Sequence, residues 1–280
     1  MSVLMSIFLG IVQGLSEFLP ISSSGHLSIF QNLFGLQYDE GDHLLFDVLL
    51  HLATLASVCV VYRRELKEMI ADTMDLILGR TAAGDSSGRL KPTVRSVLLI
   101  VVATLPLILV VPFHSKIETL YYNTPFIAFA LIITGMLLFV SGKFAEGRKN
   151  ERTATVMDAF VVGLAQAVAT IPGLSRSGTT ITVGMSRGYR TDYAVRFSFL
   201  MSIPAVLGST IISLFSAVKN GIVWGNVPVY LIGMIFAGVV GYFALSFIKR
   251  FITKQPLTYF AYYCWGMGIL ALILSLVLKK

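Results

Sequence analysis

The sequence predicts an all-α, polytopic membrane protein: an inverted-topology repeat with six transmembrane helices and two re-entrant helix-turn-helix hairpins. Three observations predict this fold. First, 55% of the 280 residues are hydrophobic and 13% are charged, about half the charged fraction of a soluble domain. Second, six apolar runs are each long enough, or nearly so, to cross a membrane. Third, two similar polar motifs, 153 residues apart, interrupt further apolar stretches.

The six apolar runs are predicted to be membrane-spanning helices. Only helices and closed barrels satisfy their backbone hydrogen bonds in lipid, and these runs lack the period-two alternation of barrel strands. The predicted spans cover residues 44–62, 97–113, 125–140, 193–218, 226–248 and 258–278.

The two polar motifs predict an internal repeat. Residues 10–25 are GIVQGLSEFLPISSSG and residues 163–178 are GLAQAVATIPGLSRSG. Each motif breaks an apolar stretch with proline, serine and glycine, so we expect re-entrant hairpins at 3–35 and 159–189. Their helices are expected at 3–18 and 22–35, and at 159–171 and 176–189. Three spans follow each hairpin, which makes 1–140 the first repeat and 159–280 the second. Because three crossings are an odd number, the second repeat enters the membrane from the opposite side.

The basic residues support this topology and argue against a nucleic-acid partner, despite a net charge of +7. With loop 63–96 in the cytoplasm, 16 of the 22 Lys and Arg residues fall in cytoplasmic loops, as the positive-inside rule requires. The loop at 36–43, placed outside, is acidic. Loop 63–96 is expected to contain one surface helix, Glu65 to Leu78, and a flexible segment at 84–88. We therefore expect a multi-pass protein of the cytoplasmic membrane, with membrane lipids as partners.

Ionisable groups inside a membrane are expensive, so those in the motifs require an explanation. In the first motif Gln13 and Glu17 share one helical face, and Pro20 ends the helix. In the second motif Pro172 and Gly173 break the helix. Polar turns that open the next helix then follow: Ser22, Ser23, Ser24, Gly25 and His26 in the first motif, and Ser175, Arg176, Ser177, Gly178, Thr179 and Thr180 in the second.

These turns predict an anion site, because helix N-termini present N–H groups and a positive dipole end. Arg176 adds a guanidinium suited to phosphate. Glu17, helped by Gln13, would bind a divalent cation or act as a general base, and His26 would carry a proton. The alternatives are structural: serines that only cap helices, a Glu17–Arg176 pair that only joins the two halves, and a His26 that only forms a hydrogen bond.

Asp47 and His51 form another polar pair four residues apart, on the first span. They would support the site or only satisfy each other, and the sequence does not decide between these roles. The aromatic residues at 121–129 and 259–263 are interpreted as interfacial belts.

At these residues the chain resembles the undecaprenyl-diphosphate phosphatase family, also called the bacitracin-resistance family. The stretches QGLSEFLPISSSGH and PGLSRSGTT resemble its two motifs, in order and at the right separation, and the similarity extends along the whole chain. The resemblance implies removal of one phosphate from undecaprenyl diphosphate, which yields the lipid carrier for peptidoglycan synthesis. It also implies dependence on a divalent cation (Mg²⁺ or Ca²⁺), a homodimer and an active site that opens to the outer face.

Together these arguments give a hypothesis with a named role for each residue. The catalytic residues would be Glu17, Ser23, His26 and Arg176, and the attacking group would be Ser23, His26 or a water. Glu17 and Gln13 would hold the cation. The expected substrate-binding residues are Gln13, Ser22, Ser24, Gly25, Ser175, Ser177, Gly178, Thr179 and Thr180. The alternative is a polyprenyl-phosphate transporter that uses the same anion site.

Overall fold

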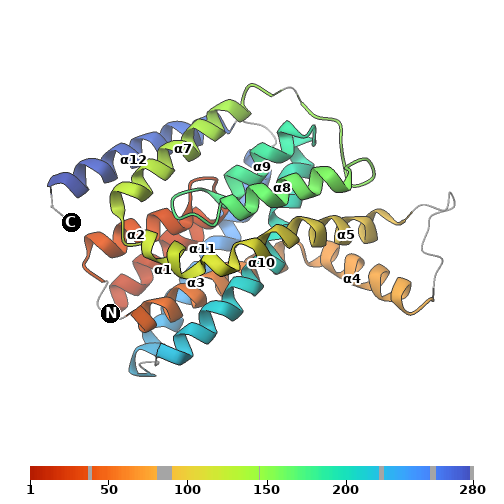
Figure 1. Ribbon diagram of the computed structural model, residues 1–280. Helices are drawn as coiled ribbons and strands as arrows, with labels where there is room; N and C mark the ends of the chain where they lie inside the picture. The colour runs from red at the N-terminus through yellow and green to blue at the C-terminus, as the bar shows by residue number, and fades with distance from the viewer. Residues whose placement is uncertain (37–39, 81–89, 145, 221–223, 253–256, 278–280) are drawn as a thin grey trace.

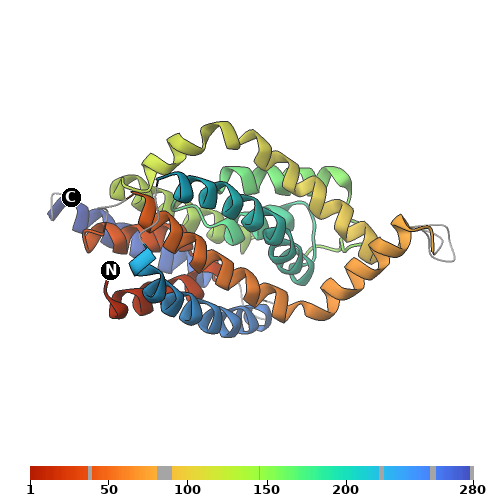
Figure 2. The same cartoon turned by 90° about the horizontal axis from the view of Figure 1, so that it is seen from below.

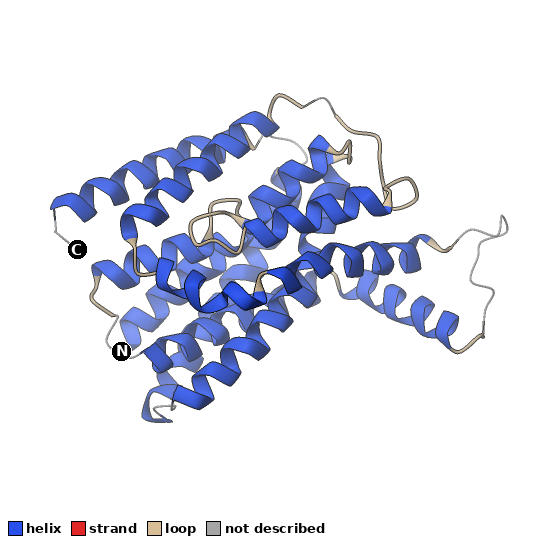
Figure 3. Ribbon diagram, in the orientation of Figure 1, coloured by secondary structure: helices blue, strands red, loops and turns tan. Residues whose placement is uncertain are grey.

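The computed structural model is a bundle of helices (Figures 1 and 3). It describes residues 1–36, 40–80, 90–144, 146–220, 224–252 and 257–277, without the side chains of 40–44, 217 and 220. The expected flexible segment 84–88 and most of the acidic loop 36–43 lie outside the described residues or side chains. The helices are α1 (Val3–Phe18), α2 (Ser23–Leu33), α3 (Glu40–Val61), α4 (Arg63–Ile77), α5 (Pro92–Thr104), α6 (His114–Leu120), α7 (Thr124–Ser141), α8 (Val156–Val168), α9 (Arg176–Ser186), α10 (Thr191–Asn220), α11 (Val227–Phe251) and α12 (Thr258–Val277), with the 3₁₀ helices η1 (Leu105–Leu109), η2 (Val111–Phe113) and η3 (Trp224–Asn226).

Five of the helical segments in the described part of the chain are long and apolar enough to cross a membrane, and there are up to six if a bent pair counts as one span. The bent pair consists of Leu45–Val61, which is most of α3, and α4. The axis of α4 is bent by 80° from that of α3 (Figure 2). The prediction of a separate helix near Glu65 to Leu78 is confirmed by α4. The prediction of six spans is confirmed only as five or six.

The second predicted span, 97–113, is not one regular α-helix. The α-helix of α5 ends at Thr104, and the chain continues through η1 and η2 into α6. Pro106 and Pro112 lie in the first turns of η1 and η2, where a proline has no N–H to donate to the preceding turn. The whole segment Pro92–Leu120 nevertheless remains one candidate span of 29 residues.

The distribution of side chains is that of an integral membrane protein. Large apolar side chains face outward all around the bundle, among them Leu4 at 80% and Phe215 at 74% exposed, while Gln13 at 0% and Glu17 at 8% lie inside. A soluble protein of this kind would expose broad apolar patches to water. In a membrane the same surface contacts lipid, and polar groups are held inside the bundle.

The basic loops gather at one end of the bundle, here called the basic end. Arg196 at the start of α10 pairs with Glu65 of α4 and with Glu151 of the loop before α8. Lys249 at the end of α11 lies over the ring of Tyr62 at the end of α3. Segments that are distant in sequence, but predicted to be cytoplasmic, therefore lie together.

The outer ends of α8 and α9, away from the turn that joins these helices, also lie at the basic end. Asp158 in the first turn of α8 is fully buried and accepts hydrogen bonds from Lys149 (2.7 Å) and from Arg187, which follows α9 (2.9 Å). Burial alone would raise the pKa of the Asp158 carboxyl, but bonds from Lys149, Thr155 and Arg187 outweigh it and lower the pKa to about 2. The carboxylate therefore stays charged and ties the two helix ends together.

The outer ends of α1 and α2 lie at the other end of the bundle. The ring of Phe8 in α1 contacts Phe30 and Phe34 at the end of α2, with ring centroids 5.0 and 6.0 Å away. Asn32 donates to the carbonyl of Tyr121, in the turn between α6 and α7. Arg95, near the start of α5, donates to the carbonyl of Ala154 at the basic end. The candidate span Pro92–Leu120 then leads away from the basic end to the turn that contains Tyr121. This turn therefore lies at the end opposite to the basic end.

Helix α1 packs closely on α11 through glycines. A methyl group on Gly10 would overlap the carbonyl oxygen of Gly233, and one on Gly14 would lie 2.7 Å from the carbonyl oxygen of Ala237. Small residues allow helix backbones to approach in a membrane, where van der Waals packing drives association. This contact determines where the polar face of α1, with Gln13 and Glu17, points.

Candidate functional site

The two broken motifs meet in the interior of the bundle. A methyl group on Gly25 would lie 3.0 Å from the Cα of Gly173, and one on Gly178 would lie 3.2 Å from the Cβ of Pro20. Turns that are about 150 residues apart in the chain are thus in direct contact. The glycines favour this close approach, because a methyl group at either position would be in tight contact with the other turn.

The first turn is held in a strained conformation. Ser22 caps α2 with φ 72° and ψ 93°, and it is the only non-glycine residue with positive φ in the described part of the chain. Its hydroxyl accepts from the N–H of Gly25 at 3.2 Å. Such a backbone costs about 1–3 kcal/mol and persists where the surrounding structure enforces it, commonly at functional sites.

The second turn is capped in the same way without that strain. The Ser175 hydroxyl accepts from the N–H of Gly178 at 3.1 Å, and the Ser175 N–H donates to the hydroxyl of Thr134 in α7 at 3.0 Å. The capping hydroxyls therefore already occupy one first-turn N–H of α2 and one of α9. Ser22 and Ser175 thus cap their helices, and their predicted part in substrate binding stays a prediction.

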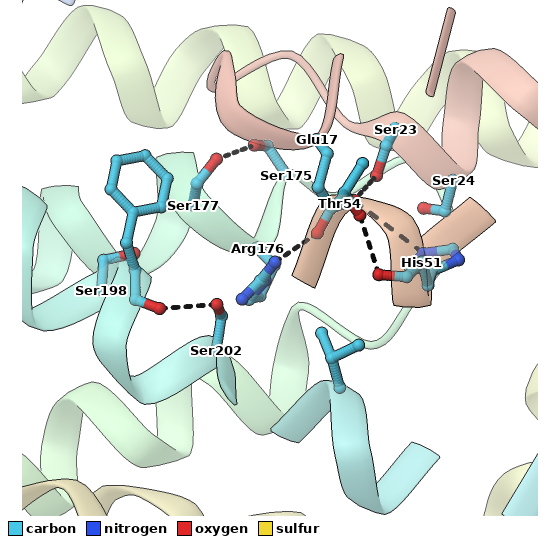
Figure 4. A network of polar contacts seen from close by, with 12 residues as sticks. Glu17, Ser23, Ser24, His51, Thr54, Ser175, Arg176, Ser177, Ser198 and Ser202 are labelled. Atoms are coloured by element: carbon cyan, nitrogen blue, oxygen red, sulfur yellow. Dashed lines mark hydrogen bonds and ion pairs between the residues drawn. The ribbon is translucent and has the colours of Figure 1, made fainter. Parts of the chain in front are cut away.

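Glu17 is the centre of the polar cluster (Figure 4). It accepts hydrogen bonds from Gln13 Nε2 at 3.1 Å and from Ser23 Oγ at 2.6 Å, and it pairs with Arg176 through Nη2. The predicted meeting of Glu17, Ser23 and Arg176 is thus found in the structure. A carboxylate this deeply buried is stable only because three donors surround it.

His51 completes the cluster. Its Nδ1 lies 2.8 Å from the backbone carbonyl of Asp47, which can only accept, so Nδ1 carries the proton. Its Nε2 then faces Glu17 at 3.9 Å. The Asp47 carboxylate instead accepts from Gln31 at 2.9 Å. His51 thus lies next to the Glu17 cluster while its Nδ1 bonds to the backbone of Asp47. A supporting role for His51 stays a prediction.

Two atoms of this cluster are buried without a hydrogen-bond partner: Nη1 of Arg176 and Oε1 of Gln13. A buried polar atom left unpaired costs about 1–3 kcal/mol, and native proteins rarely leave one without a reason. One is a donor and the other an acceptor, and both belong to residues that contact Glu17. The cluster therefore has unused capacity for a charged ligand.

The ring of His26 forms its hydrogen bonds with residues outside this cluster. Its Nδ1 lies 2.8 Å from the carbonyl of Ser22, and its Nε2 lies 2.8 Å from the hydroxyl of Tyr263 in α12. Both ring nitrogens are therefore used away from Glu17 and Arg176. No hydrogen bond from the His26 ring to Glu17 or Arg176 is found among the described residues, and its role as a proton carrier stays a prediction.

The remaining predicted binding residues have different positions. Ser24 and Ser177 contact the capping serines, with oxygen separations of 3.4 Å in each turn. Thr180 bonds to Ser198 of α10 at 2.6 Å and to the carbonyl of Arg176, a structural role. Thr179 is buried, and its hydroxyl has no partner.

Sequence reasoning missed Tyr263, which it interpreted as part of an interfacial belt. No local pattern could have identified it, because the contact joins residues 237 positions apart. Thr134 was also missed for this reason, since its hydroxyl bonds to both Gly173 and Ser175 from another helix. His51 did have a signal, its i, i+4 spacing from Asp47.

Comparisons with known proteins show what the whole chain is similar to. The family model described as "Bacitracin resistance protein BacA" matches residues 6–270. A protein of Treponema denticola named undecaprenyl-diphosphatase is 40% identical over 271 residues, 96% of each chain. Proteins of the same name from Alkaliphilus metalliredigens and Carboxydothermus hydrogenoformans are 38% identical over 282 residues (99% of this chain and 100% of the relative) and 37% identical over 273 residues (96% of each).

Proposed function

Because the chain belongs to the bacitracin resistance protein BacA family, we propose that it hydrolyses undecaprenyl diphosphate to undecaprenyl phosphate and inorganic phosphate. This activity recycles the lipid carrier for peptidoglycan synthesis and confers bacitracin resistance. The observation that carries the proposal is the cluster of Glu17, Ser23 and Arg176, which brings an acid, a hydroxyl and a guanidinium together inside the bundle. A lipid diphosphate needs such a place, since its tail stays in lipid while its phosphates require charged partners.

Arg176 binds and stabilises the phosphates in this proposal. Its unpaired Nη1 is available to a phosphate oxygen, and Nη2 leaves Glu17 when the more highly charged diphosphate arrives. The N-termini of α2 and α9 add their positive dipole ends. These groups stabilise the charge that develops on the phosphoryl oxygens in the transition state.

Glu17 acts as the general base. It accepts the hydrogen bond of the Ser23 hydroxyl at 2.6 Å, within the range needed for proton transfer. The attacking oxygen belongs to Ser23 or to a water held in its place. It forms a bond to the terminal phosphorus as the bond from that phosphorus to the bridging oxygen breaks, undecaprenyl phosphate leaves, and the proton of the attacking group passes to Glu17. If Ser23 attacks, a water then hydrolyses the phosphoserine and releases inorganic phosphate.

The proposal includes a divalent cation, Mg²⁺ or Ca²⁺. No group of three or more His, Cys, Asp or Glu side chains that could hold a metal lies within the described part of the chain. The unpaired Oε1 of Gln13 next to the Glu17 carboxylate nevertheless provides two hard oxygen ligands. This fits Mg²⁺, which is commonly held by one or two protein oxygens together with substrate phosphates and waters. When bound, the cation would neutralise phosphate charge.

We also propose the inverted repeat, with re-entrant hairpins at 3–35 and 159–189 in the repeats 1–140 and 159–280. Two observations support it: the outer ends of α8 and α9 lie at the basic end, and those of α1 and α2 lie at the opposite end. In this proposal the basic end lies in the cytoplasm of a bacterial cytoplasmic membrane, as the positive-inside rule favours. The site opens to the outer face, as the family resemblance implies. The partners are membrane lipids, the lipid diphosphate and a second copy of the chain in a homodimer, without nucleic acid.

The decisive test is phosphate release by purified protein in detergent, with undecaprenyl diphosphate as substrate. We expect turnover that is lost when a chelator is added and restored by Mg²⁺ or Ca²⁺. In the Glu17→Gln variant the hydrogen bonds with Ser23 and Gln13 can still form, but the carboxylate that acts as the base is absent. We expect the rate of phosphate release to fall about 100-fold or more. A transporter would release no phosphate in detergent, where no gradient exists, and this outcome would reject the proposal.

A further inference from the structure

His26 is held by two partners whose chemistry determines its protonation. The Ser22 carbonyl can only accept a hydrogen bond, so Nδ1, 2.8 Å away, carries the proton. In the neutral ring the other nitrogen is then a bare acceptor. The Tyr263 hydroxyl, 2.8 Å from Nε2, donates to it. His26 is therefore fixed as the Nδ1–H tautomer.

The strained turn contributes to this arrangement. The carbonyl that His26 contacts belongs to Ser22, whose φ of 72° belongs to the left-handed region. His26 also donates its backbone N–H to the same carbonyl at 3.2 Å. The Ser22 carbonyl thus accepts from both the ring Nδ1–H and the backbone N–H of His26. This fixes which side of the ring faces α12.

Tyr263 is built to hold the ring from the other side. The two ring planes are within 11° of parallel, with centroids 5.6 Å apart. His26 is 3% exposed, whereas Tyr263 is 46% exposed on the outer surface of α12. Among the described residues, Tyr263 is the one side chain that forms a hydrogen bond with Nε2, and it links the buried histidine to the lipid-facing surface.

We propose that Tyr263 is a positioning residue for His26: the Ser22 carbonyl selects the Nδ1–H tautomer, and the Tyr263 hydroxyl donates to Nε2 and so holds in place the ring nitrogen that exchanges a proton. Ser23 precedes His26 by three residues at the start of α2 and therefore lies on the same face of that helix. Release of the Tyr263 bond leaves Nε2 as a free acceptor while the Ser22 carbonyl keeps Nδ1 protonated. Tyr263 thus controls whether Nε2 is available as an acid or base. The part of this inference that concerns turnover rests on the proposed function.

The test is Tyr263→Phe, which keeps the ring and removes only the hydroxyl. The matched control is Tyr259→Phe, on the same helix and 57% exposed. In protein labelled with ¹⁵N-histidine, the His26 signals are identified by their loss in His26→Asn, since the chain has four histidines. We expect wild type and Tyr259→Phe to show a pure Nδ1–H tautomer, and Tyr263→Phe to show a displaced Nε2 signal.

Turnover provides a second readout. We expect Tyr263→Phe to lower kcat about tenfold with KM unchanged, a fraction of the 10²–10⁴-fold that a complete acid–base group contributes. Tyr259→Phe should leave both constants unchanged. Unchanged His26 signals and an unchanged kcat in Tyr263→Phe would overturn the inference. Absence of phosphate release by the wild type would reject the proposed function instead, and the ¹⁵N signals would still test the role of Tyr263.

Discussion

Glu17 and Arg176 form a buried ion pair that lacks the full set of partners a purely structural pair needs. The side chain of Glu17 is 6% exposed and that of Arg176 is 20% exposed, yet Nη1 of Arg176 is buried and unpaired. Buried pairs add little net stability, because removal of the two charges from water offsets their attraction. A pair with an unused donor is better explained as a resting state that a phosphate rearranges.

This explanation separates stability from activity at the residue scale. Arg176→Ala leaves the Glu17 charge buried and uncompensated, so we expect a loss of about 3–5 kcal/mol in the free energy of unfolding. Phosphate release should fall at least about 100-fold, as when a group that stabilises transition-state charge is removed. Adding Glu17→Gln should restore most of the stability and none of the activity.

Thermal unfolding in detergent and phosphate release measure the two effects. A structural pair predicts that the double variant regains activity together with stability. Near-normal turnover of Arg176→Ala alone would contradict both the phosphate-binding role and the transition-state role.

At the scale of elements, the site depends on how closely α1 approaches α11. Glu17 projects from α1, and α1 is positioned by glycine contacts that leave no space for a methyl group, at Gly10 against Gly233 and at Gly14 against Ala237. The helix α12, which supplies Tyr263, packs against α7 on the other side of the site, as Figure 1 shows. The site is therefore assembled between two separate helix packings.

We expect Gly10→Ala to destabilise the protein by about 1–3 kcal/mol, the usual cost of overpacking, because α1 must move away from Gly233. The shift would displace Glu17, so phosphate release should also fall. Gly266→Ala is the matched control: it lies in α12, and a methyl group there would meet nothing within 4 Å. Its unfolding temperature in detergent should be unchanged or slightly higher, since alanine favours a helix over glycine. Equal effects of the two substitutions would contradict the packing argument.

For the whole molecule, the helix pairs α1–α2 and α8–α9 have their outer ends at opposite ends of the bundle, and the turns within the two pairs are in contact. The basic loops lie around the outer ends of α8 and α9, and the turn between α6 and α7 contacts the end of α2. This arrangement brings a helix N-terminus from each half to one place inside the bundle. A single chain segment could not supply two such termini there.

Labelling with a membrane-impermeant maleimide tests the arrangement. In a Cys59→Ser background, where the remaining Cys264 is buried, Tyr122→Cys and Arg148→Cys place single thiols at exposed positions in opposite end loops. We expect the thiol at 122 to react in intact cells and the thiol at 148 to react only after permeabilisation. Reaction of both thiols from one side would contradict the inverted topology, whatever the activity assay shows.

The sequence by itself determined the class of protein, the places where helices break and most of the polar cluster. The hairpin helices predicted at 3–18, 22–35, 159–171 and 176–189 correspond to α1, α2, α8 and α9. Local rules produce this agreement, because prolines end helices, serines cap them and apolar runs need lipid. Pro106 and Pro112 obey the same rules and were visible in the sequence, although a single α-helical span was expected there.

Only the tertiary structure decided which side chains contact Glu17 and which contact His26. The contact of His51 with Glu17 and that of Tyr263 with His26 join separate helices, at sequence separations of 34 and 237 positions. A helix in a membrane can rotate about its axis without exposing its backbone, so its sequence does not determine which neighbour a given face meets. The close glycine contacts and the packing of α12 determine it, and through them the chemistry available at the site.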